Sequence, residues 1–208
     1  MIDMVKHMKK RYIILLCTIL SVFFIGYILT GYISPFDTFF YQKIISFKGN
    51  STTNFFIIIS DVTYLLIVIT ALFWILYKNK RLSFLVTLNL GLSFICSYIL
   101  KFIFKRARPF GIALVIEKGY SMPSSHSMVC ISFFGFLFYY IYKNFKKGMF
   151  KNSLLMGIAF YILIIGISRI YLGVHYASDV LLGFTFGLIY LSIFIKLFQK
   201  EIVLTKEK

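Results

Sequence analysis

The chain has 208 residues, of which 60% are hydrophobic, 20% aromatic and only 14% charged. A soluble domain is about half apolar and about a quarter charged, so this composition excludes an ordinary soluble protein. The formal net charge is +16, but the basic residues flank hydrophobic stretches. That pattern favours anionic lipid head groups, and not nucleic acid, as the partner of the basic residues.

Six apolar stretches follow one another along the chain, each close to the ~20 residues that a membrane-spanning helix needs. They lie near residues 12–33, 55–77, 83–104, 127–142, 153–172 and 177–198. In lipid a helix satisfies its own backbone hydrogen bonds, and the strand alternation that a barrel would need is absent. The sequence therefore predicts an all-α bundle of six transmembrane helices, in a single membrane-embedded domain over residues 1–208.

Four basic segments indicate the orientation of this polytopic membrane protein. They precede the first span, separate the second from the third and the fourth from the fifth, and follow the sixth. Their basic residues are Lys6, Lys9, Lys10 and Arg11; Lys78, Lys80 and Arg81; Lys143, Lys146, Lys147 and Lys151; and Lys196, Lys200, Lys206 and Lys208. Six spans place all four segments on one side, which the positive-inside rule makes cytoplasmic. We therefore expect a multi-pass protein of the cell membrane with both termini in the cytoplasm.

Two further features of the spans and connections carry structural expectations. The first outer connection, residues 34–54, mixes aromatic and polar residues and is expected to contain a short amphipathic helix at the interface. Gly183 and Gly187 form a G-x-x-x-G pattern that indicates close helix packing. The three cysteines all fall inside apolar stretches, so neither a disulfide nor a metal site is expected.

A second group of polar residues lies at span ends that this orientation places on the opposite, outer side. It comprises Lys101, Lys105, Arg106 and Arg108 near the end of the third span; Ser124, Ser125 and His126 at the start of the fourth; Arg169 near the end of the fifth; and His175 and Asp179 at the start of the sixth. Ionisable residues at membrane depth are costly, so such a cluster indicates a functional site.

The basic and hydroxyl residues of this cluster suit phosphate. Lys101 and Arg108 are seven residues apart, so on one helix they would project from the same face. Pro109 disfavours helix at Arg108 and would end the span there. Arginine matches phosphate with a planar fork, and the start of a helix near Ser124 offers hydroxyls and free N–H groups to an anion. Together they would stabilise the charge of a reacting phosphoryl group.

The two histidines have different surroundings. His175 and Asp179 are four residues apart, so on a helix the carboxylate would meet the imidazole and fix its tautomer. The other ring nitrogen of His175 would then attack phosphorus, and His126 would protonate the leaving oxygen as a general acid. This division of labour is what histidines with unlike neighbours permit.

These residues resemble a known family. The segments Lys101-x6-Arg108-Pro109, Pro123-Ser124-Ser125-His126 and Ser168-Arg169-x5-His175-x3-Asp179 are similar to the three-part signature of the type-2 phosphatidic acid phosphatases, which share a core with vanadium haloperoxidases. The motifs cover about half of the chain, and the six-helix layout extends the resemblance to nearly all of it. One position departs from the signature, because Ser125 stands where the family usually has glycine.

The resemblance implies a role for each matching residue. His175 would be the nucleophile, Asp179 its orienting partner and His126 the general acid. Phosphate would be bound by a set of basic and hydroxyl residues, namely Lys101, Arg108, Ser124, Ser125 and Arg169. The resemblance implies neither a metal nor another cofactor, and nothing in the sequence indicates an obligate protein partner.

Three other charged residues are interpreted separately. Asp61, inside the second span, would either line the head-group cavity or bond a neighbouring helix. Lys105 would share the helical face of Lys101 and either touch substrate or lie at the interface. Glu117, in the outer connection after the third span, is expected to be a solvated loop residue.

The sequence thus predicts a metal-independent lipid phosphate phosphohydrolase whose site faces outward. Undecaprenyl diphosphate, phosphatidylglycerophosphate and phosphatidate are the substrates that the resemblance suggests. A phosphotransferase that passes the phosphate to another lipid or sugar is the alternative. A membrane anion-binding or transport protein is a third hypothesis, but binding alone needs no nucleophile such as His175.

Overall fold

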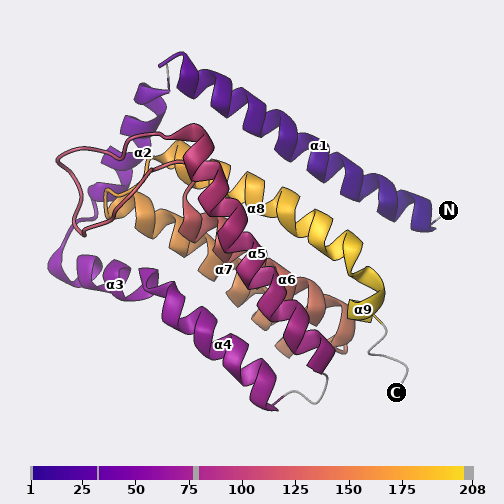
Figure 1. Cartoon of the computed structure of the whole chain (residues 1–208). Coiled ribbons are helices and arrows are strands. Elements are labelled where there is room, and N and C mark those ends of the chain that lie inside the picture. The colour runs from indigo at the N-terminus through magenta and orange to yellow at the C-terminus, as the bar shows by residue number, and fades with distance from the viewer. Residues whose placement is uncertain (1, 32, 77–79, 204–208) are drawn as a thin grey trace.

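The computed structural model describes residues 2–31, 33–76 and 80–203. In these residues all regular secondary structure is helical, which confirms the all-α class (Figure 1). The helices are α1 (Ile2–Leu29), α2 (Ser34–Ile45), α3 (Asn50–Ser60), α4 (Val62–Leu76), α5 (Lys80–Phe104), α6 (Ser125–Asn144), α7 (Met149–Tyr171), α8 (Ala177–Leu197) and α9 (Gln199–Val203).

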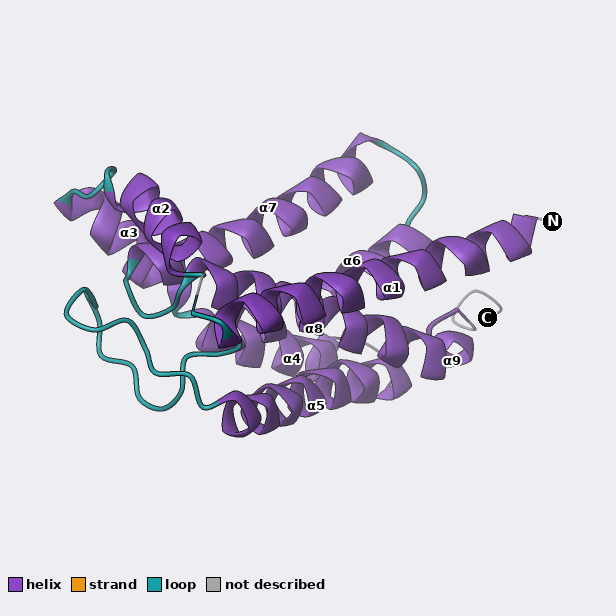
Figure 2. Cartoon of the chain, turned by 90° about the horizontal axis from the view of Figure 1, so that it is seen from above, coloured by secondary structure: helices purple, strands orange, loops and turns teal. Residues whose placement is uncertain are grey.

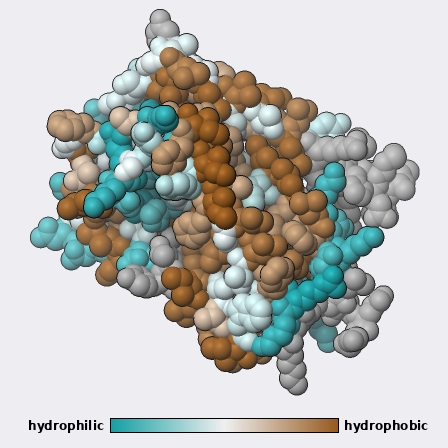
Figure 3. Space-filling model, in the orientation of Figure 1, coloured by the Kyte–Doolittle hydropathy of each residue, from teal (hydrophilic) through white to brown (hydrophobic). Residues whose placement is uncertain are grey.

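The helices are long and apolar enough to cross a membrane. Within the described residues, five segments pass by length and composition: α3 with α4, then α5, α6, α7 and α8. A sixth is obtained if α1 from Ile14 onward and α2, which are bent by 102° relative to each other, are counted as one span. An apolar belt covers the face of the molecule seen in Figure 3. The chain is thus a multi-pass membrane protein, and the number of spans reaches the predicted six when the bent pair is counted as one span.

One predicted span and one predicted connection differ in detail from the observed helices. The second span is broken at Asp61, which ends α3 with φ −78° and ψ 56°. The Asp61 side chain is exposed at this break and lies outside the cavity described below. The first outer connection forms α2, as expected, and then continues into α3.

Helix α6 lies at the centre of the bundle and packs against α5, α7 and α8. Its buried residues Phe133 and Phe136 belong to the main hydrophobic core. Glycines bring α8 close to α6: a Cβ on Gly183 would lie 2.7 Å from the Ser124 carbonyl oxygen, and one on Gly187 would clash with Ile131. These contacts confirm the close-packing interpretation of the G-x-x-x-G pattern.

The ends of the helices separate into two groups (Figure 2). One end of the bundle carries α2, the start of α3, the α5–α6 loop and the α7–α8 turn. The other end carries the start of α1, the α6–α7 connection and α9. This arrangement confirms that the predicted site segments meet at one end of the bundle. Of the residues used to predict orientation, Lys78, Lys206 and Lys208 lie outside the described residues.

Candidate active site

The connection between α5 and α6 forms a long loop over one end of the bundle. α5 ends at Phe104, and Lys105 takes a φ of 47°, in the left-handed region that a continuing α-helix does not use. Pro109 keeps the preceding residue Arg108 out of helical conformation as well. The prediction that Arg108 shares a helical face with Lys101 is therefore wrong.

The loop nevertheless brings Arg108 to the site by another route. The backbone N–H of Ser121 donates to the carbonyl of Arg106 at 2.8 Å, which closes the loop on itself. The N–H of Leu114 donates to the Leu172 carbonyl at 2.9 Å and ties the loop to the end of α7. Lys105, by contrast, is exposed and does not line the cavity.

A cavity of about 380 Å³ lies between this loop and the helix ends. It is lined by Tyr98, Lys101, Phe102, Arg108, Glu117, Lys118, Gly119, Tyr120, Ser125, His126 and His175. The lining includes five of the eight predicted site residues. The other three, Ser124, Arg169 and Asp179, are buried outside this lining.

His175 lies between a cation and a carboxylate. Arg108 Nη1 is 3.2 Å from His175 Nε2, and it also donates to the Val174 carbonyl at 2.8 Å. On the other side of the ring, His175 Nδ1 is 3.7 Å from Asp179 Oδ2. Nδ1 has no hydrogen-bond partner among the described residues, so only a small shift toward Asp179 is needed to form one. The ring therefore turns Nε2 toward the cavity cations and Nδ1 toward the carboxylate.

The pair spans the start of a helix and not a helical face. α8 begins at Ala177, so His175 precedes the helix and Asp179 stands in its first turn. Asp179 Oδ2 accepts the N–H of Tyr176 at 3.0 Å, which caps the helix. The same oxygen accepts a hydrogen bond from the Ser121 hydroxyl. The i,i+4 spacing was thus informative, although the expected helical geometry was wrong.

A turn before α8 sets the position of His175. Gly173 has a φ of 68°, which favours glycine, and it lies against the loop so closely that a Cβ would clash with the Ile112 carbonyl. The tight turn lets the chain reverse from α7 to α8 within a few residues. His175 consequently lies beside the loop residue Arg108.

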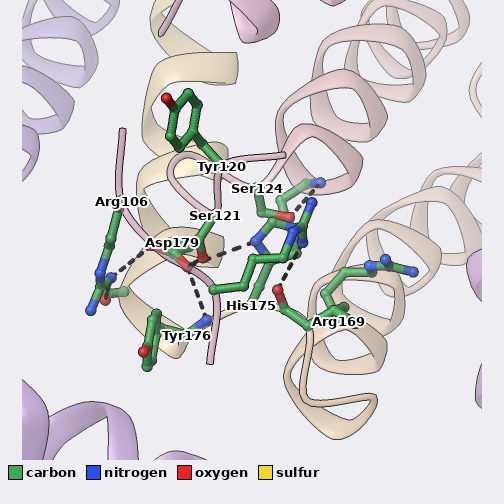
Figure 4. A network of polar contacts seen from close by, with 12 residues as sticks. Arg106, Tyr120, Ser121, Ser124, Arg169, His175, Tyr176 and Asp179 are labelled. Atoms are coloured by element: carbon green, nitrogen blue, oxygen red, sulfur yellow. Dashed lines mark hydrogen bonds and ion pairs between the residues drawn. The ribbon is translucent and has the colours of Figure 1, made fainter. Parts of the chain in front are cut away.

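Behind this pair lies a network that the sequence did not reveal (Figure 4). Arg106 Nη1 donates to Asp179 Oδ1 at 2.7 Å, and Arg106 Nη2 donates to Asp37 Oδ2 at 2.9 Å. The Tyr176 ring stacks on the Arg106 guanidinium at 4.0 Å. Asp37, in the first turn of α2, had no predicted role. The sequence offered one indication of a role for Asp37, namely that acidic residues are rare: the chain has only seven.

The second motif forms the start of α6. Ser124 is the N-cap, and its hydroxyl accepts from the N–H and hydroxyl of Ser127 at 3.5 and 3.1 Å. The Ser124 N–H donates to the Asp179 carbonyl at 3.0 Å, so this serine ties α6 to α8. Ser125 lines the cavity and accepts a hydrogen bond from Ser97 at 2.7 Å. Its extra hydroxyl, relative to the usual glycine, is therefore held by α5.

The remaining cations are held by the loop. Lys101 Nζ donates to the carbonyls of Tyr120 and Ser121 at 2.6 and 3.2 Å. The Arg169 guanidinium forms an ion pair with Glu117, which also lies 3.7 Å from Arg108. The interpretation of Glu117 as a solvated loop residue is therefore wrong. Its carboxylate lies among the cations because a cluster of buried positive charge needs a counter-charge.

The electrostatics of the loop and turn residues follow from these contacts. Burial lowers the pKa of His175 to about 4, although Asp179 acts in the opposite direction. Burial likewise lowers the pKa of Arg108 below its ordinary value. For Arg106, Asp179 and Asp37 outweigh burial and raise the pKa. His175 is therefore a neutral imidazole at physiological pH, with both arginines charged.

No group of three or more His, Cys, Asp or Glu side chains that could hold a metal ion occurs within residues 2–31, 33–76 and 80–203. The protein groups that meet in the cavity are instead two imidazoles, several cations and hydroxyls. This set can bind an anion, attack it and transfer a proton.

Comparisons with known proteins agree with this geometry. Residues 82–202 match the model of the PAP2 superfamily. Phosphatidylglycerophosphatase B of Bacillus subtilis (strain 168) is 33% identical over 144 residues, which cover 69% of this chain and 70% of that protein.

Two crystal structures share the fold. One, from Bacillus subtilis, is described as the first transmembrane PAP2 type phosphatidylglycerolphosphate phosphatase; its TM-score is 0.76 at 25% identity, over 92% of this chain and 96% of that one. LpxE of Aquifex aeolicus matches with a TM-score of 0.60 at 20% identity, over 75% of this chain and 92% of that one. The second likeness concerns the fold alone. The family model covers more than half of the chain, so the chain belongs to the PAP2 superfamily, and it is a lipid phosphatase.

Proposed function

We propose that this chain hydrolyses a lipid phosphate or diphosphate through a phosphohistidine intermediate on His175. The observation that carries the proposal is the position of the His175 ring. Its Nε2 faces the cavity cations, 3.2 Å from Arg108 Nη1, and its Nδ1 faces the buried Asp179 carboxylate at 3.7 Å. A neutral imidazole held in this way presents a lone pair where the cations attract phosphate.

In the first step Nε2 of His175 attacks phosphorus, and the bond between phosphorus and the lipid oxygen breaks. His126, which lines the same cavity, gives its proton to the leaving oxygen. Asp179 accepts from Nδ1–H and stabilises the positive charge that forms on the ring. Arg108 and Lys101 stabilise the negative charge on the phosphoryl oxygens.

In the second step water attacks the phosphohistidine. His126, now neutral, takes a proton from that water, and the N–P bond breaks. Inorganic phosphate leaves, His126 carries its proton again, and His175 returns to the neutral state. With a diphosphate substrate the leaving group of the first step is the lipid monophosphate, and the rest is unchanged.

The cavity also supports the entry of a lipid from the side. Tyr98 and Phe102 line it, and both are exposed on the surface of α5, with 64% and 48% of their surface accessible. Their rings pack 4.7 Å apart, and Phe102 packs on Tyr120 at 5.7 Å. This aromatic wall joins the polar end of the cavity to the bilayer. The head group is proposed to lie at the histidines, with the hydrocarbon beyond Phe102.

The proposed orientation places the site on the extracytoplasmic face of the cell membrane. It rests on the positive-inside rule, since the basic segments near Lys80 and Lys143 belong to the end opposite the cavity. Labelling of a single cysteine at Lys118, in the exposed loop, tests this. A membrane-impermeant reagent should react from outside in intact cells; reaction from the cytoplasmic side alone would contradict the proposal.

Phosphatidylglycerophosphate is the first substrate to test, because the relatives from Bacillus subtilis are named for it. Purified protein in detergent would be assayed for phosphate release from this lipid, phosphatidate and undecaprenyl diphosphate, with chelator present and no added metal. We expect release by the wild type, none by His175→Ala and severe impairment of His126→Ala. Unchanged activity of His175→Ala would refute the mechanism.

The same assay separates hydrolysis from transfer. A competing alcohol is added, and its phosphate ester is sought among the products. Free phosphate as the sole phosphorus product supports a hydrolase. A phosphorylated alcohol, lipid or sugar acceptor as the main product would support the phosphotransferase alternative.

A further inference from the structure

Asp37 links the N-terminal part of the chain to the start of α8. Its Oδ1 accepts the backbone N–H of Ser178 at 2.8 Å, and its Oδ2 accepts the Ser178 hydroxyl at 2.9 Å. The side chain is only 4% exposed. A carboxylate from α2 therefore caps α8, where the positive end of the helix dipole favours negative charge. Asp37 lies outside residues 82–202, the part of the chain that matches the family model.

Arg106 joins Asp37 to the carboxylate beside the nucleophile. Its guanidinium donates to Asp37 Oδ2 at 2.9 Å, to Asp179 Oδ1 at 2.7 Å and to the Ser178 hydroxyl at 2.8 Å. The fork geometry of the guanidinium lets one side chain hold both carboxylates. Arg106 does not line the cavity, so its position is set by these partners and not by substrate.

The network bears directly on the state of Asp179. This carboxylate is fully buried, and Arg106 is its one cationic partner within hydrogen-bond distance among the described residues. A buried carboxylate without such a partner becomes protonated or turns away. Either change removes the acceptor that faces Nδ1 of His175.

We propose that Asp37 and Arg106 are positioning residues of the reaction: Asp37 holds Arg106, and Arg106 holds Asp179 ionised and aimed at His175. This inference rests on the function proposed above. It assigns to α2 a part in catalysis, although no α2 residue lines the cavity.

The positioning role predicts a particular kinetic pattern. Arg106→Gly should lower kcat by roughly 10- to 100-fold, the range that outer-shell partners of active-site imidazoles show in metal enzymes. Asp37→Asn, which keeps the shape and an acceptor for Ser178, should lower kcat less, by about tenfold. KM should change less than about twofold in both, because neither side chain meets substrate.

A chemical rescue separates positioning from a general structural role. Guanidinium chloride at tens of millimolar should restore part of the kcat of Arg106→Gly, because the free ion fills the same site between the two carboxylates. Urea at equal concentration has similar shape but no charge, and it should restore nothing. On the acid side of a plot of kcat against pH, the activity of Arg106→Gly should also begin to fall at a higher pH than that of the wild type. Guanidinium should move this fall back toward the pH of the wild type.

Two matched controls remove comparable charges elsewhere. Lys105→Asn changes the exposed neighbour of Arg106, with a residue that tolerates its positive φ, and Asp61→Asn changes an exposed acid. Both should retain wild-type kcat. All variants are compared by size exclusion and thermal unfolding in the same detergent.

The outcomes are distinguishable. If the wild type releases no phosphate, or His175→Ala equals it, the proposed function fails and not the positioning role alone. If the wild type is active, unchanged kcat in the folded Arg106→Gly and Asp37→Asn overturns the inference. So does a rise in KM alone, a rescue by urea equal to that by guanidinium, or loss of folding in both variants.

Discussion

The guanidinium of Arg108 directly contacts the attacking nitrogen proposed for His175, with Nη1 3.2 Å from Nε2. The same side chain donates to the carbonyls of Gly119, Lys118 and Val174 at 3.1, 3.0 and 2.8 Å. Three backbone carbonyls thus hold the planar Arg108 guanidinium beside the Nε2 atom of His175. In the proposed mechanism, phosphate takes over the donors of Arg108 before Nε2 is free to attack.

Replacement of Arg108 by lysine is therefore expected to be damaging. Lysine keeps the charge but not the fork, so it cannot hold the loop carbonyls and phosphate together. Arg108→Lys should raise KM roughly tenfold and lower kcat by a similar factor, which corresponds to the loss of about one charged hydrogen bond in the substrate complex and of about two in the transition state. Steady-state phosphate release measures both constants. Lys105→Asn is the control; equal kinetics of Arg108→Lys and wild type would contradict the assignment.

The pH dependence follows from the burial of His175. Because burial lowers its pKa to about 4, the imidazole stays neutral and nucleophilic from physiological pH down to that value. The contribution of His175 to kcat/KM should therefore be constant above about pH 4 and fall tenfold per unit below it. An ordinary imidazole, with a pKa of about 6.5, would already lose nine-tenths of its reactive form near pH 5.5.

The measurement is kcat/KM against pH, corrected for the separately titrated ionisation of the substrate. A limb near pH 6.5 assigned to His175 would contradict the structure. The same shift predicts that stability falls as pH drops from about 6.5 toward 4, because in that window only the unfolded chain takes up the proton.

Glu117 lies beside two arginines that are proposed to bind phosphate. It forms an ion pair with Arg169 and lies 3.7 Å from Arg108. Glu117→Gln removes a like charge from the path of an incoming anion but keeps the shape and hydrogen-bonding capacity of the side chain. We expect inorganic phosphate to inhibit this variant roughly fivefold more tightly, about 1 kcal/mol for one partly solvated charge.

Competitive inhibition by phosphate is measured for both proteins at several salt concentrations. Salt should reduce the difference, since it screens the exposed part of Glu117. Weaker inhibition of the variant would mean that Glu117 orders Arg169 for phosphate and does not compete with it.

The close contact between α6 and α8 leads to a prediction about stability. Gly183→Ala places a methyl group 2.7 Å from the Ser124 carbonyl oxygen, so α8 has to move away from the start of α6. Overpacking of this kind costs about 1–3 kcal/mol. Gly157→Ala on α7 is the matched control, because a Cβ there meets nothing within 4 Å. Thermal unfolding in detergent should show a lower midpoint for Gly183→Ala alone; equal midpoints would contradict the observed packing.

The helical class and the spans were readable from the sequence because the bilayer imposes one length and one backbone solution on every span. The gathering of Lys101, His126 and His175 at one end also followed, from counting spans. The third apolar stretch was expected to end at residue 104, and α5 does end at Phe104; the expected continuation of the helix toward Arg108 was wrong, because Lys105 has a positive φ. The break at Asp61 was not predicted, because the sequence was interpreted as one span there.

The contact between two motif residues could be predicted from the sequence, whereas the contacts of their supporting partners could not. Spacing alone paired His175 with Asp179, since a helix or a turn at the start of a helix brings residues four apart together. Arg106 and Asp37 are 69 residues apart, and Arg169 and Glu117 are 52 apart. No periodicity links such pairs, because their meeting depends on how the α5–α6 loop folds over the helix ends. By itself the sequence determined the membrane fold and the residues that are proposed to react; only the tertiary structure decided which charges hold them, since a buried charge takes its partner from whatever the fold brings near.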